Sequence, residues 1–73
     1  MTFEKAKTCL LIEIDYLTKK IKTIQQLWEE AKKSGDPQRE FWGMQLMWDN
    51  GELRATRKAL EILQAVQDEE DLA

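Results

Sequence analysis

The residues Ser34-Gly35-Asp36-Pro37, near the middle of the chain, combine the signals that end one helix and start another. Glycine readily adopts the left-handed conformation that ends a helix. Aspartate is a preferred N-cap, and proline suits the first position of the helix that follows. Because the connection is so short, we expect two neighbouring, antiparallel helices joined by a tight turn.

The two expected helices account for nearly all of the 73 residues, which form a single helical-hairpin domain. We place the first helix at residues 3–34, with Thr2 as its cap. The turn then covers 34–37 and the second helix 37–68. Residues 68–73 form an acidic tail, which we expect to fray because acids at a helix C-terminus oppose the helix dipole.

The first helix carries an apolar stripe with alternating spacings of four and three residues, as in a heptad seam. This seam consists of Leu10, Ile14, Leu17, Ile21, Ile24, Trp28 and Ala31. A flank of further apolar residues widens it to one side: Cys9, Ile12, Tyr16 and Leu27. Residues 10–16 also alternate in the manner of a strand, but no second stretch could pair with them, so we predict a helix.

The second helix has two apolar faces. The first face consists of Phe41, Met44, Trp48, Ala55, Ala59, Ile62 and Val66, with Gly51 on the same side. The second face, nearly opposite, consists of Trp42, Leu46, Leu53 and Leu60. Small residues allow helices to approach closely, so we assign the first face to packing against the first helix. The second face then has no partner within the chain, which predicts assembly into a four-helix bundle or a larger helical oligomer.

The dipeptide Asn50-Gly51 offers an alternative, because it is a turn signal and glycine inside a helix costs about 1 kcal/mol. A break there would give three helices. The first face keeps its helical phase through Gly51, so we predict a continuous second helix and keep the break as the alternative.

Composition argues against several function classes. With no histidine and a single cysteine, the chain lacks the usual catalytic triads and zinc sites, so we expect no enzyme activity, metal or cofactor. No apolar run approaches the ~20 residues of a membrane span. Glu13 and Asp15 interrupt the apolar run 9–17, which argues against a signal peptide. The unpaired Cys9 suits a reducing compartment, so we expect a cytoplasmic protein.

The charges indicate a near-neutral body with an acidic end. The net charge is −3, but four of the fourteen acids lie in the tail, which leaves ten acids against eleven basic residues. Asp49 and Glu52 have the spacing of a carboxylate metal site, yet no second pair faces them. A turn near residue 35.5 sets Lys22 level with Asp49, so we interpret Asp49 and Glu52 as solvated or weakly paired surface charges.

These patterns predict a non-catalytic, homo-oligomeric and most simply dimeric protein-binding module, such as an inhibitor, adaptor or small regulator. We expect the interface to use Trp42, Leu46, Met47, Leu53 and Leu60, rimmed by Arg39 and Arg57. One alternative is an oligomer that captures a small anionic or nucleotide-like ligand between subunits. Another is an RNA-binding hairpin that uses the arginines, although the absence of a basic block argues against nucleic acid.

Overall fold

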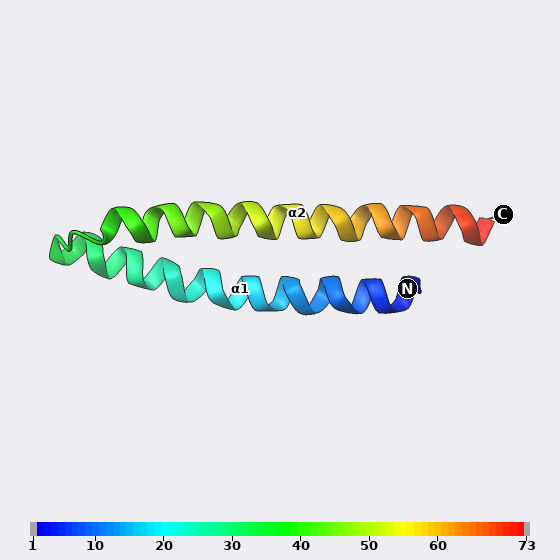
Figure 1. The fold of residues 1–73 in the computed structure, drawn as a ribbon, viewed down its shortest axis with the longest axis horizontal. Coiled ribbons are helices and arrows are strands. Elements are labelled where there is room, and N and C mark those ends of the chain that lie inside the picture. The colour runs from blue at the N-terminus through cyan, green and yellow to red at the C-terminus, as the bar shows by residue number, and fades with distance from the viewer. Residues whose placement is uncertain (1, 73) are drawn as a thin grey trace.

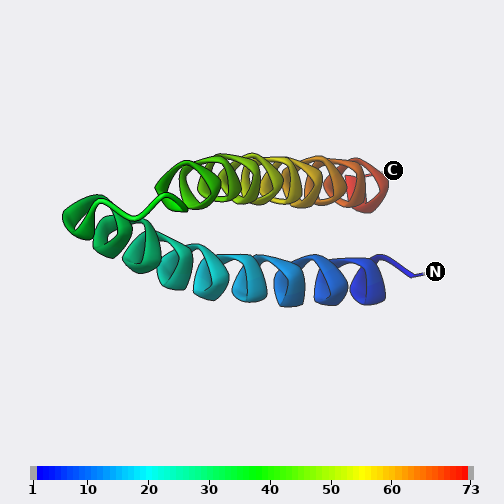
Figure 2. The ribbon, with the colours of Figure 1, turned by 60° about the vertical axis from the view of Figure 1, so that its left-hand side comes forward.

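The computed structural model describes residues 2–72, which form two antiparallel helices, α1 (Phe3–Ser34) and α2 (Arg39–Leu72). Figures 1 and 2 show the helices side by side, joined at one end by the turn, with α2 projecting past the start of α1. The hairpin is thin, with extents of 58 × 15 × 14 Å. The predicted all-α, two-helix hairpin is confirmed.

The turn forms as its residues predict. Gly35 has φ 69° and ψ 26°, in the left-handed region, and ends α1. The backbone N–H groups of Gly35 and Asp36 both donate to the carbonyl oxygen of Ala31, which satisfies an otherwise unpaired helix end. The Asp36 carboxylate accepts from the backbone N–H of Gln38 at 2.8 Å, as expected of a capping residue.

The start of α1 is as predicted, whereas α2 differs from the prediction at both of its ends. The Thr2 hydroxyl oxygen accepts from the backbone N–H of Lys5 at 3.2 Å, so the predicted cap is confirmed. The α-helical hydrogen bonding of α2 begins at Arg39, two residues later than predicted, because Pro37 and Gln38 form a turn. The predicted end of the second helix at residue 68 is wrong: α2 is helical to Leu72. The last turns contain no glycine or proline, and Gln64 donates to the Asp68 carboxylate at 2.9 Å.

The second helix is continuous through Asn50-Gly51, so the alternative with three helices is wrong. The Asn50 side chain donates to the carbonyl oxygen of Leu46, one turn earlier, at 2.9 Å. This bond ties the asparagine into the helix instead of a turn. The chain therefore presents one long, straight surface from Arg39 to Leu72.

The core lies between the helices and is small. On α1 it is the predicted seam: Leu17, Ile24 and Ala31 are buried, and the other four seam residues are half-buried. On α2 the inward stripe contains the second face, because Leu53 is buried and Trp42, Leu46 and Leu60 are half-buried. The predicted face assignment is therefore wrong, and it is the first face that α1 leaves uncovered.

The error has a physical cause. The inward stripe of α2 keeps the same alternation of four and three residues as the seam of α1, but polar residues occupy some of its positions. Its buried or half-buried members are Trp42, Leu46, Asp49, Leu53, Thr56, Leu60, Leu63 and Gln67. Asp49, Thr56 and Gln67 hide the heptad from a reading of hydrophobicity alone. The spacing that matches α1 decides which face packs.

Candidate interaction surfaces

The buried carboxylate of Asp49 lies in the middle of the helix–helix contact. Its side chain is 0% exposed, and its Oδ1 lies 3.4 Å from Nζ of Lys20. The Gln45 side-chain amide donates to both carboxylate oxygens, at 3.2 and 3.3 Å. The prediction that Asp49 is a solvated or weakly paired surface charge is wrong, because the inward stripe turns Asp49 towards α1, where Lys20 on the edge of the seam reaches it. This cluster is a structural element between the helices.

The exposed first face of α2 continues onto α1. An apolar groove of about 510 Å³ between the helices is lined by residues of both, among them Cys9, Leu10, Ala59, Ile62 and Val66. Cys9 therefore lies on the same side of the hairpin as the first face. The helical repeat places residues on this same side when they follow Cys9 by three, seven or eighteen positions. They complete the flank of α1: Ile12, Tyr16 and Leu27.

The first face and the flank together form a large apolar surface, which we call the apolar side of the hairpin. Its eight large apolar side chains are exposed by 36–63%: Ile12, Tyr16, Leu27, Phe41, Met44, Trp48, Ile62 and Val66. Together they expose an area on the order of 800 Å², about what one partner contributes to a standard protein–protein interface. A monomeric protein rarely exposes so much apolar surface on one side.

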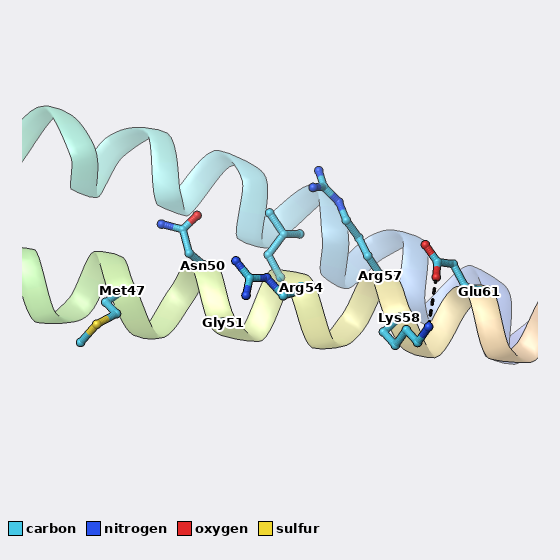
Figure 3. Close-up of a pocket in the computed structure, with 8 residues that line it drawn as sticks. Met47, Asn50, Gly51, Arg54, Arg57, Lys58 and Glu61 are labelled. Atoms are coloured by element: carbon cyan, nitrogen blue, oxygen red, sulfur yellow. Dashed lines mark ion pairs between the residues drawn. The ribbon is translucent and has the colours of Figure 1, made fainter.

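Basic and polar residues line a different surface of α2. A hollow of about 810 Å³ is bordered by three cationic side chains, those of Arg54, Arg57 and Lys58. Figure 3 shows that Lys58 points away from α1 and pairs with Glu61, at 3.7 Å. Neither arginine forms an ion pair with another residue of the range 2–72. The hollow can therefore accept an anionic group.

The predicted interface residues are divided between these regions. Trp42, Leu46, Leu53 and Leu60 belong to the core of the hairpin, so the reason for assigning them to an interface no longer holds. Met47 is 64% exposed and lines the hollow together with Arg57. Arg39 is exposed at the start of α2, and its guanidinium donates to the backbone oxygen of Asp36 at 3.5 Å. An interface role for Met47, Arg39 and Arg57 stays a prediction.

Aromatic side chains gather at the turn end of the hairpin. Gly43 brings α2 close to Trp28, since a Cβ atom at Gly43 would lie 3.1 Å from Nε1 of the indole. Nζ of Lys32 lies 3.6 Å from the centre of the Trp28 ring, in a cation–π contact. Trp42 packs edge-on against Phe41, with ring centres 5.0 Å apart. These contacts fix the turn end, but they leave Phe41 and Trp48 largely exposed.

Within residues 2–72 the structure has no cluster of three metal-ligating side chains. No helix in this range is long and apolar enough to cross a membrane. No protein-family model, curated protein or solved structure matches the chain.

Proposed function

We propose that this chain is a non-catalytic, protein-binding hairpin that assembles with itself, most simply as a dimer with a four-helix core. In this dimer the first face of α2 contacts the other copy, whereas the sequence had predicted that the second face would do so. The observation that carries it is the apolar side, which includes exposed residues of both helices, while the hollow on α2 is lined by cations.

A second copy is a better occupant than an occasional partner because the hairpin needs the apolar side covered in order to be stable. Among residues 2–72, only four apolar side chains are buried: Leu17, Ile24, Ala31 and Leu53. A domain of this size rarely gains more than roughly 3–5 kcal/mol from its own core. A second copy is always present, and association stabilises the folded state by mass action.

Light scattering on the purified protein tests the proposal, with two matched variants. Ile62 is 55% exposed on the apolar side, whereas Leu11 is 52% exposed and lines a groove together with Lys7, Leu60 and Glu61. We expect wild type and Leu11→Glu to have twice the mass of one chain, and Ile62→Glu to have the mass of one chain. A monomeric wild type, or a dimeric Ile62→Glu, contradicts the proposal.

The cationic hollow supports a second candidate function, the binding of an anionic ligand. Arg54 and Arg57 both border the hollow, and charged hydrogen bonds from guanidinium groups to phosphate are strong. Calorimetric titration with pyrophosphate and with ATP tests this function against the double variant Arg54→Gln/Arg57→Gln. Binding that the double variant loses supports it, and no heat of binding to the wild type rules it out.

A further inference from the structure

The exposed first face of α2 is symmetric along the helix about Ala55. Its members lie four, seven and eleven residues to either side of that residue. Gly51 and Ala59 are the small pair at four residues, Trp48 and Ile62 the large pair at seven, and Met44 and Val66 the large pair at eleven. All of these residues are exposed. A surface that reads the same in both chain directions can meet its own copy in antiparallel orientation.

Charge follows the same symmetry. Glu52 lies three residues before Ala55 and Lys58 three residues after it, and both are exposed. Between two antiparallel copies, Glu52 of one chain and Lys58 of the other stand at the same height. They lie on opposite edges of the first face, because three residues turn the helix by about 300°, so they do not pair across the contact. The symmetry ends beyond these positions, where Phe41 has Glu69 as its counterpart.

The neighbouring helix has a matching centre. Gly43 lies against Trp28, and Cys9 and Ile62 line one groove, so positions whose numbers sum to about 71 stand level in the hairpin. Tyr16 is therefore level with Ala55. A two-fold axis at the height of Ala55 therefore also lies level with Tyr16, which is 55% exposed and belongs to the flank of α1.

We propose that two copies pack α2 against α2 in antiparallel orientation about a two-fold axis that passes beside Ala55. This register rests on the proposed self-association and names its geometry. It sets Gly51 against Ala59 of the second copy, where small side chains allow close approach, and Trp48 against Ile62. An isologous contact of this kind closes on itself and gives a dimer.

Disulfide trapping tests the register in a Cys9→Ala background, which removes the native thiol. A disulfide needs Cα atoms about 4.4–6.8 Å apart. Ala55→Cys places its two thiols next to each other across the axis. Ala59→Cys is the matched control on the same face: its two copies lie about 12 Å apart along the helix, because four residues of rise separate each from the axis.

We expect Ala55→Cys to form covalent dimers in oxidised glutathione at least about ten times faster than Ala59→Cys, since only the former satisfies the distance for a disulfide. A mixture of Gly51→Cys and Ala59→Cys chains should form the mixed dimer at a rate like that of Ala55→Cys. A Cβ atom at Gly51 meets nothing within 4 Å, so this variant leaves the hairpin intact. Circular dichroism on each variant confirms that it is helical.

The outcomes separate the register from self-association itself. A wild type of dimeric mass in which Ala59→Cys cross-links as fast as Ala55→Cys overturns the register and leaves the proposed function standing. A monomeric wild type overturns both.

Discussion

The two apolar faces of α2 differ in composition and in burial, and the face with more polar residues is the more buried one. The second face shares its stripe with Asp49, Thr56 and Gln67, yet it is the one that packs against α1. The members of the first face from Met44 to Val66 are apolar residues or glycine, yet they are exposed. The difference shows that, in a two-helix hairpin, the spacing shared with the facing helix selects the inner face. Apolar content then indicates what remains for a partner.

The largest expected effect comes from the charge on the inner face. Asp49→Ala removes the shared acceptor of Lys20 and Gln45 in the helix contact, so we expect a loss of about 2–4 kcal/mol in the free energy of unfolding, as for other buried hydrogen-bonded networks. Urea denaturation followed by circular dichroism measures it. Glu52→Ala, an exposed acid one turn further, should change the same quantity by less than about 0.5 kcal/mol at concentrations that keep the protein monomeric. Equal losses would contradict a structural role for Asp49.

The second prediction compares one large residue from each face. Leu53→Ala removes a buried side chain and should cost about 2–4 kcal/mol even when the protein is monomeric. Ile62→Ala removes an exposed one, so its effect should appear in the dissociation constant of the dimer. Denaturation at several protein concentrations separates the two. The comparison fails if Leu53→Ala changes only the concentration dependence.

The third prediction uses a glycine beside the inner contact. Gly43→Leu forces a large side chain against the Trp28 indole, so we expect a loss of about 1–3 kcal/mol from overpacking. The tryptophan fluorescence of the folded protein should also change, because the indole must move away from Lys32. Denaturation curves that match the wild type would show that the turn end repacks freely.

The smallest effect is expected at the glycine of the outer face. Gly51 lies in regular helix with open space around its missing Cβ, so Gly51→Ala should raise the stability of the monomer by about 0.5–1 kcal/mol. Urea denaturation in dilute protein measures this gain. A loss of stability in dilute protein would mean that Gly51 contacts part of its own chain.

Local signals in the sequence were sufficient to predict the fold. They were not sufficient to predict the exposed surfaces, which depend on how the two helices pack. Gly35, Asp36 and Thr2 act through hydrogen bonds to neighbours a few residues away, so their roles follow from residue type. Which face of α2 packs depends on the other helix, and a buried Asp49 becomes tolerable only when Lys20 and Gln45 reach it. Lys22 stands level with Asp49 but is exposed, and the partner is Lys20, which lies on the edge of the seam.

The Asp49–Lys20 pair also discriminates against competing structures of the same chain. Two antiparallel helices with heptad seams can slide past each other by seven residues and still bury apolar side chains. Sliding one heptad in either direction would set Asp49 against Glu13 or Leu27 in place of Lys20. The buried carboxylate would then face a like charge or an apolar side chain, at a cost of several kcal/mol. One ion pair in the core thus widens the energy gap between the native alignment and its slipped alternatives.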